Sequence, residues 1–256
     1  TLSLGMPSTI LPYLFRREGI ISSSGCDTGY FGTTSSMYEG RPDIQLHNMI
    51  TAGDSFLFEN TLKFSKWLKD DVGAPSDYGL FGQGMVFGPT LLHAKARGEV
   101  RLRPAANNTS QDPIIEYEAF HEDKDLDRLI EGVRRVQNIM TQPSMASHEP
   151  TLLHSRALSE DFGADTDEYW RQYIKRFGFV IYHPTGTCKM GTVDEPMSVV
   201  DPKLRVIGIR SGGSAGGCGL RVADASVMPD ITSGNTQVPT AAIGVQMVRI
   251  LKEVYG

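Results

Sequence analysis

The stretch His183-Pro184-Thr185-Gly186-Thr187-Cys188-Lys189-Met190-Gly191 is the most informative part of this chain. It follows an apolar run over 178–182 that predicts a buried strand, which would put His183 at a strand end. Pro184 fixes its own φ and restricts the residue before it to extended geometry. The local sequence therefore predicts a histidine ring that is held in a reproducible orientation, as a catalytic group requires.

A second informative region lies further along the chain. It consists of two segments, Asp224-Ala225-Ser226-Val227-Met228-Pro229 and Ser233-Gly234-Asn235-Thr236-Gln237-Val238-Pro239-Thr240. Together with the histidine stretch, these segments resemble the C-terminal signature of the glucose–methanol–choline (GMC) oxidoreductases, flavoenzymes that oxidise alcohols. The resemblance extends more weakly through Arg41–His47 and Lys95–Leu102, so it covers most of the chain.

The resemblance implies catalytic roles for His183 and Asn235, which match the family's pair of residues facing the reactive edge of FAD. Histidine suits the removal of the alcohol proton because its ordinary pKa lies near about 6.5. Asparagine suits stabilisation of the resulting alkoxide because its amide donates hydrogen bonds without titrating. Hydride transfer belongs to the cofactor. The sequence does not identify the alcohol or the electron acceptor.

The resemblance also implies residues that contact FAD. Asp224 and Ala225 match the strand end that runs beside the pyrophosphate and ribityl chain. Thr236 and Gln237 match residues that approach the isoalloxazine through backbone groups. The same likeness gives the expected fold class, α+β, with a mainly antiparallel sheet backed by helices. Residues 1–190 would form the substrate-binding domain, and 191–256 a strand–helix segment that completes the FAD-binding domain.

The hydrophobic pattern by itself favours the same fold class. Alternation predicts strands, and apolar residues at helical spacing predict helices. The predicted strands cover 43–47, 99–103 and 115–119, and the predicted helices cover 124–141, 169–177 and 239–255. We expect a capping box of Asp165 and Glu168 before the middle helix. Residues 1–40, rich in Ser, Gly and Thr, predict loops and short strands.

The composition excludes several classes of protein. The chain has 256 residues and a net charge of −5, which argues against a nucleic-acid partner. No apolar run approaches the roughly 20 residues that span a bilayer. Three cysteines, Cys26, Cys188 and Cys218, are not a disulfide framework. The cellular compartment stays open.

The chain departs from the family pattern in two places. No strand is followed by G-x-G-x-x-G, the motif that cradles the FAD diphosphate, so we expect a piece of a longer polypeptide whose N-terminal region supplies that site. Residues 211–218, Ser-Gly-Gly-Ser-Ala-Gly-Gly-Cys, are additional to the family pattern. They suggest either an inserted flexible loop between two strands or a splicing artefact.

The sequence also bears on three alternatives to an alcohol-oxidising flavoenzyme. Gly212, Ser214 and Gly216 fit the nucleophile elbow G-x-S-x-G, but no histidine follows His183, so a hydrolase triad order fails. A zinc site of His183, Cys188 and Cys218 lacks ligand spacing. A degenerate relative that acts only as a binding domain stays open, although both catalytic residue types are present.

We expect this polypeptide alone to bind FAD weakly or not at all and to be inactive, because the diphosphate-binding motif is absent. Absorbance of the purified chain near about 450 nm, the visible band of a flavoprotein, checks this. A stoichiometric flavin that co-purifies with the chain would contradict it.

Overall fold

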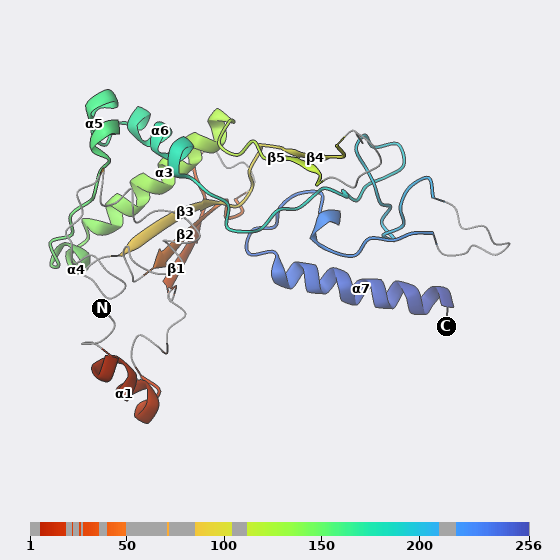
Figure 1. Cartoon of the computed structure of the whole chain (residues 1–256), viewed down its shortest axis with the longest axis horizontal. Coiled ribbons are helices and arrows are strands. Elements are labelled where there is room, and N and C mark those ends of the chain that lie inside the picture. Colours follow the sequence, from red (N-terminus) through yellow and green to blue (C-terminus); the bar gives the residue numbers. More distant parts are fainter. Residues whose placement is uncertain are drawn as a thin grey trace. The chain divides into compact units, whose positions relative to one another are not determined.

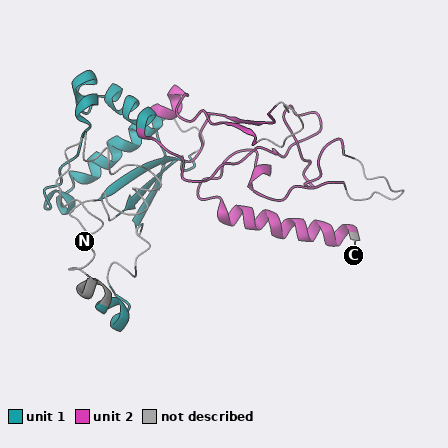
Figure 2. Ribbon diagram, viewed as in Figure 1, with its two compact units in different colours: residues 1–91, 127–176 teal, residues 92–126, 177–256 magenta. Residues whose placement is uncertain are grey.

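The computed structural model describes residues 6–18, 22, 26, 28–35, 40–49, 71, 85–103, 112–209 and 219–255. One helix, α1, precedes a run of antiparallel strands, β1 to β5, and a run of helices follows them, as the predicted α+β class requires (Figure 1). The chain divides into two compact units, shown in Figure 2: Thr1–Leu91 with Asp127–Arg176, and Leu92–Leu126 with Phe177–Gly256. The predicted division near residue 190 concerns the domains of the complete protein and stays a prediction. Among the described residues, none of the helices has the length and hydropathy needed to cross a bilayer.

Unit 1 contains a three-stranded antiparallel sheet in the order β1-β2-β3, which comprises Thr28–Gly32, Ile44–Met49 and Val86–Leu91. The central strand confirms the strand predicted over 43–47. Its Ile44 lies opposite Gly32 on one side and Leu91 on the other. Ile44 and Leu46, which share one face of the pleat, are both buried. This face therefore forms part of the core of the unit.

The helix α3, Asp123–Met140, packs on that face and confirms the helix predicted over 124–141. Gly132 makes the close packing possible: a Cβ there would lie 2.9 Å from Ile44 Cδ1 and 3.0 Å from Pro89 Cβ. The helix and the sheet approach each other at a residue that has no side chain. The opposite side of α3 is polar, as expected for an amphipathic helix.

A buried ion pair joins the sheet to α3. Asp43, which is fully buried, accepts a hydrogen bond from Arg128 Nε at 2.9 Å. It also accepts from the backbone N–H of Thr34 at 2.7 Å and from the Thr34 hydroxyl. Burial alone would raise the pKa of Asp43, but the hydrogen bonds from Thr34 and the hydrogen bond and charge of Arg128 lower it below its ordinary value.

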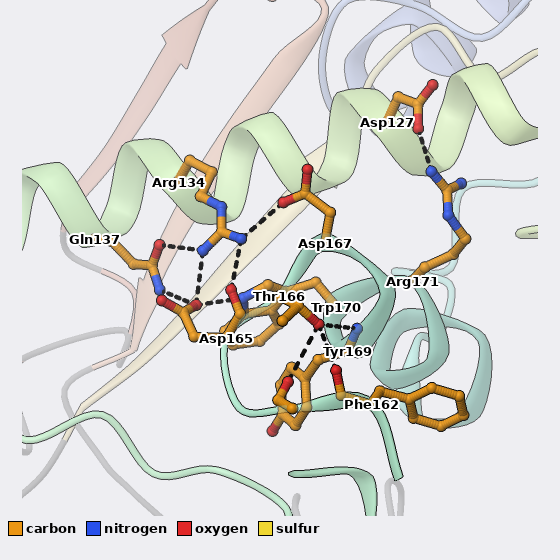
Figure 3. A network of polar contacts seen from close by, with 11 residues as sticks. Asp127, Arg134, Gln137, Phe162, Asp165, Thr166, Asp167, Tyr169, Trp170 and Arg171 are labelled. Atoms are coloured by element: carbon orange, nitrogen blue, oxygen red, sulfur yellow. Dashed lines mark hydrogen bonds and ion pairs between the residues drawn. The ribbon is translucent and has the colours of Figure 1, made fainter.

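A second polar network fastens α6, Asp167–Phe177, to α3 (Figure 3). One oxygen of Asp165 accepts from Arg134 Nη1 at 2.7 Å, from Gln137 Nε2 at 2.6 Å and from Trp170 Nε1 at 2.6 Å. Burial tends to raise the pKa of Asp165, but these hydrogen bonds and the Arg134 charge lower it. Trp170 also packs edge-on against Tyr169, with ring centroids 5.0 Å apart. The network therefore orients the aromatic core of the unit.

The same network corrects the predicted capping box. Asp165 has a φ of 64° and binds Arg134 instead of capping the helix. The cap is the next residue, Thr166, whose hydroxyl accepts from the backbone N–H of Tyr169 at 3.1 Å. Glu168 accepts a hydrogen bond from Gln172. Asp165 and Thr166 are both good capping types, and the basic side chain 31 residues earlier decided between them.

The N-terminal region also differs from its prediction. Residues 1–40 were expected to be loops and short strands, and β1 confirms a strand there, but Met6–Arg16 form a helix, α1. Pro12 lies inside this helix. A proline in a helix interior removes a hydrogen bond and is usually a stop signal, so the sequence argued against a helix at this position.

Unit 2 contains a two-stranded antiparallel ribbon and a long helix. The ribbon, β4 Glu99–Arg101 with β5 Ile114–Glu116, confirms both predicted strands and their pairing. The helix α7, Gln237–Tyr255, confirms the helix predicted over 239–255. Its Ile250 is buried in a core with Val200, Leu204 and Val227.

Two extended segments of unit 2 flank the additional residues 211–218, which lie outside the described part of the chain. Val206 N donates to Leu220 O at 2.8 Å, and Arg205 and Arg221 form an antiparallel bridge. The segments before and after the extra residues therefore run side by side, as an insertion between two strands requires.

The strand predicted over 178–182 is wrong. The segment is irregular, and Phe179, Val180 and Tyr182 are 43%, 39% and 67% exposed. Tyr182 has a φ of 62°, which breaks an extended run. Burial of such a segment needs a facing surface, and within the described ranges no strand pairs with it. A hydrophobic segment alone is therefore not sufficient to predict a buried strand.

The residues after it form a turn that depends on Gly186, whose φ is 89°. The turn is closed by the backbone N–H of Lys189, which donates to Gly186 O at 3.2 Å. A Cβ at Gly186 would lie at van der Waals distance, 3.5 Å, from Met228 O. Glycine is therefore required at position 186 because of the positive φ, and not because a side chain would lack room.

We predict that Asp43→Asn lowers the stability of unit 1 by about 3–5 kcal/mol, because the buried guanidinium of Arg128 would lose the negative charge of the Asp43 carboxylate. The folded pKa of Asp43 is lowered, so its contribution is complete above the ordinary value of 3.8 and is lost as pH falls below it. Hydrogen exchange in β2 and α3 as a function of pH measures both effects. An acid dependence as steep in the variant as in the parent would contradict the prediction.

We predict that Gly186→Ala destabilises unit 2 by about 1–3 kcal/mol, because alanine would adopt a left-handed conformation. Gly244→Ala is the matched control. Gly244 lies inside α7 with nothing within 4 Å of an added Cβ, so alanine should stabilise by about 0.5–1 kcal/mol. Urea unfolding, followed by hydrogen exchange of unit 2, shows whether each variant lowers or raises the free energy of unfolding. Equal stability of the two variants would refute the conformational role of Gly186.

Candidate active site

The two signature regions are hydrogen-bonded to each other in unit 2. The backbone N–H of Cys188 donates to Ser226 O at 2.9 Å, and that of Met190 donates to Val227 O at 3.0 Å. Ser226 and Val227 belong to the short 3-10 helix η4, Ala225–Val227, which contacts α7. The histidine stretch, η4 and the beginning of α7 therefore form one connected body.

A side-chain hydrogen bond joins the regions at the predicted catalytic histidine. His183 Nδ1 lies 2.9 Å from Thr236 Oγ1. His183 is half-buried, and Thr236 is only 6% exposed. His183 Nε2 has no hydrogen-bond partner among the residues that the structure describes. One ring nitrogen is therefore fixed by the protein, and the other is available to a ligand.

Asn235, the predicted alkoxide donor, directly precedes Thr236. Its side chain is exposed, and its carboxamide makes no hydrogen bond within the described ranges. Because Thr236 contacts the histidine ring, the backbone of Asn235 is held close to His183. The structure thus brings the segments that bear the two predicted residues together, with the amide of one and a ring nitrogen of the other unoccupied.

The beginning of α7 adds an electrostatic feature. Thr236 is the residue before the helix, and its carbonyl accepts from Thr240 N at 2.9 Å and from Thr240 Oγ1 at 2.7 Å. Gln237, the first residue of α7, is exposed. The amino end of a helix has a partial positive charge, which stabilises a nearby anion. A negative charge that develops beside Asn235 would benefit from it.

Asp224 has a structural use. One of its carboxylate oxygens accepts from the Ser226 backbone N–H at 2.9 Å, which caps η4 before Ala225. The Ser226 hydroxyl donates to the same oxygen. Its second oxygen makes no hydrogen bond with any described residue. The predicted contacts of Asp224 and Ala225 with FAD remain predictions, which this geometry permits.

The loop before Asn235 is attached to a distant segment that the sequence did not mark. His93 Nε2 lies 2.8 Å from Ser233 Oγ, and Arg97 forms an ion pair with Asp230 at 2.7 Å. The buried carboxylate of Asp125 in turn accepts from the backbone N–H of Lys95 at 2.7 Å. No local sequence pattern reveals the contact between His93 and Ser233, because the two residues are 140 positions apart.

Within the described ranges, no three His, Cys, Asp or Glu side chains are grouped so that they could hold a metal ion. Cys188 is a free, half-buried thiol. Cys218 and the G-x-S-x-G residues 212–216 lie outside those ranges.

Comparisons with known proteins show sequence similarity over most of this chain. A family model described as GMC oxidoreductase matches residues 94–244. Choline oxidase from Arthrobacter globiformis is 31% identical over 233 residues, which are 90% of this chain and 37% of that protein. An alcohol dehydrogenase (acceptor) from Pseudomonas putida is 31% identical over 243 residues, which are 94% of this chain and 37% of that protein.

A likeness in fold accompanies the likeness in sequence. A solved structure of a formate oxidase variant from Aspergillus oryzae RIB40 covers 98% of this chain with a TM-score of 0.65 at 21% identity, using 42% of its own length. The chain thus spans about two fifths of the length of the proteins it matches. The family model covers more than half of the chain and includes His183, Asn235 and the segments that join them. The chain therefore belongs to the GMC oxidoreductase family.

Proposed function

We propose that this chain supplies the alcohol-oxidising part of the active site of an FAD-dependent GMC oxidoreductase that acts on CH–OH donors. The observation that supports it best is the His183–Thr236 hydrogen bond. It brings the imidazole to the amino end of α7, next to Asn235. The matched relatives, named as a choline oxidase and an alcohol dehydrogenase, oxidise such donors.

In this proposal, His183 is the base and Asn235 the alkoxide donor. The free Nε2 of His183 accepts the proton of the alcohol hydroxyl. The exposed carboxamide of Asn235 donates a hydrogen bond to the oxygen as it becomes negative, and the amino end of α7 adds a favourable field. When bound, FAD would supply the acceptor for the hydride that leaves the carbon bearing this oxygen. His183 thus removes the proton, and Asn235 stabilises the negative charge that this removal leaves on the alcohol oxygen.

The residues around this site fit a flavin. Asp224 keeps one carboxylate oxygen uncommitted, and the side chain of Gln237 is exposed at the end of α7. Polar groups without protein partners are what a polar cofactor requires. We assign Asp224 and Ala225 to the pyrophosphate and ribityl chain, and Thr236 and Gln237, through backbone groups, to the isoalloxazine. An N-terminal region outside this chain would hold the rest of FAD.

The substrate in this proposal is a small alcohol. Several of the curated relatives are choline oxidases or choline dehydrogenases, which makes an amino alcohol the first substrate to test. The alternative of a degenerate, non-enzymatic relative is not favoured, because both catalytic residue types are present. Among the described residues, His183 Nε2 and the Asn235 carboxamide have no hydrogen-bond partner.

We predict that His183→Ala in the complete, flavin-loaded protein lowers turnover by about 10²–10⁴-fold, because the proposed base for the alcohol proton would be lost. Asn235→Ala should lower it by about 10²–10³-fold through loss of a donor to the alkoxide. Flavin content should be nearly unchanged in both. Steady-state kinetics with choline and short alcohols, together with flavin absorbance, measure these effects.

His121→Ala is the matched control, since His121 lies between β5 and α3 and is paired with Glu118. It should retain parental turnover. Full activity of His183→Ala would refute the proposed base, and loss of activity in all three variants would point to a general loss of structure.

A further inference from the structure

We infer that Thr236 is a positioning residue for the proposed base. Its buried hydroxyl accepts the Nδ1–H hydrogen bond of His183 and thereby leaves Nε2 as the nitrogen that takes the alcohol proton. This inference rests on the proposed function. It gives Thr236 a side-chain role in addition to the backbone contact with the flavin.

The geometry supports a fixed anchor. Thr236 is 6% exposed and its Oγ1 lies 2.9 Å from His183 Nδ1. A threonine in the position before a helix usually turns its hydroxyl to the helix amides. Here that hydroxyl bonds the histidine, while the Thr236 carbonyl is held by Thr240 N and Thr240 Oγ1. The side chain is thus committed to His183, and its backbone is held at the start of α7.

The helix that bears this anchor is itself well held. Ile250 of α7 is buried against Val200, Leu204 and Val227, and Ile243 and Met247 pack on the same cluster. The hydrogen bonds from Cys188 and Met190 to η4 fix the histidine stretch on its other side. His183 is therefore held between two supports that belong to one core, which limits rotation of its ring.

The direction of the hydrogen bond follows from the chemistry of the base. A neutral imidazole has one protonated and one unprotonated nitrogen. If Nε2 is to accept the alcohol proton, the proton of the neutral ring is on Nδ1, and Thr236 Oγ1 accepts from it. When the O–H bond of the alcohol breaks, the new N–H bond forms at Nε2. Both ring nitrogens are then protonated, and the Nδ1–H hydrogen bond is strengthened by the positive charge.

The test uses the complete, flavin-loaded protein with Thr236→Val, Thr236→Ser and Thr141→Val. Valine keeps the shape of threonine but has no hydroxyl, so we expect kcat to fall by about 10–100-fold at nearly unchanged KM. Serine keeps the hydroxyl and should restore turnover to within about threefold of the parent. Thr141→Val, the control, removes a threonine hydroxyl of unit 1 that donates to Asn138 O. It should retain parental kcat.

A second measurement does not depend on activity. In ¹⁵N-histidine-labelled protein at high pH, with His183 assigned by comparison with His183→Asn, the nitrogen chemical shifts should show a protonated Nδ1 and an unprotonated Nε2. In Thr236→Val the signal should shift toward a mixture of the two tautomers. A protonated Nε2 in the parent would overturn the inference, whether or not the variants fold.

The outcomes separate the inference from the proposed function. If His183→Ala is inactive while Thr236→Val has parental kcat, only the positioning role fails. Loss of flavin from Thr236→Val in proportion to its loss of turnover would also overturn that role, since it would indicate a cofactor contact. If His183→Ala is fully active, the proposed function itself fails.

Discussion

The hydrogen-bonded junction between the histidine stretch and the segment from η4 to α7 is the constraint on which the site depends. Two backbone hydrogen bonds, donated by Cys188 and Met190, and one side-chain hydrogen bond between His183 Nδ1 and Thr236 Oγ1 join parts of the chain that are about 40 to 50 residues apart. Without this junction, the imidazole and the carboxamide of Asn235 would lie on unrelated loops. The core around Ile250 gives the junction a rigid base.

Acidic side chains organise the rest of the molecule in a similar manner. Asp43 joins the sheet of unit 1 to α3, Asp165 joins α3 to the loop before α6, and Asp125 holds the backbone of Lys95 and Ala96. Each of these carboxylates accepts more than one hydrogen bond and thereby holds two segments of the chain together. A buried or half-buried carboxylate with several donors is costly to disrupt, because its charge would be left without partners.

Two errors of the sequence-based interpretation share one cause. Asp165 and Thr166 compete for the same cap, and the sequence cannot weigh the guanidinium of Arg134 against a helix terminus. The run over 178–182 has the composition of a buried strand, but burial depends on a facing surface. In both cases a local preference was overridden by something that is not local. The helix over Met6–Arg16 is a separate case, since it forms with Pro12, a local signal against helix formation, inside it.

Local sequence patterns were enough to predict the α+β class, strands over 43–47, 99–103 and 115–119 that overlap β2, β4 and β5, the helices α3 and α7, and the family. Periodic apolar positions and a contiguous motif are local properties of the chain. The motif context also marked His183 and Asn235. In contrast, only the folded structure reveals that Thr236 occupies Nδ1 of His183 and that His93 and Arg97 hold the loop before Asn235. These contacts join residues 53, 140 and 133 positions apart, and such pairings arise from packing of the whole unit rather than from any pattern within a short window.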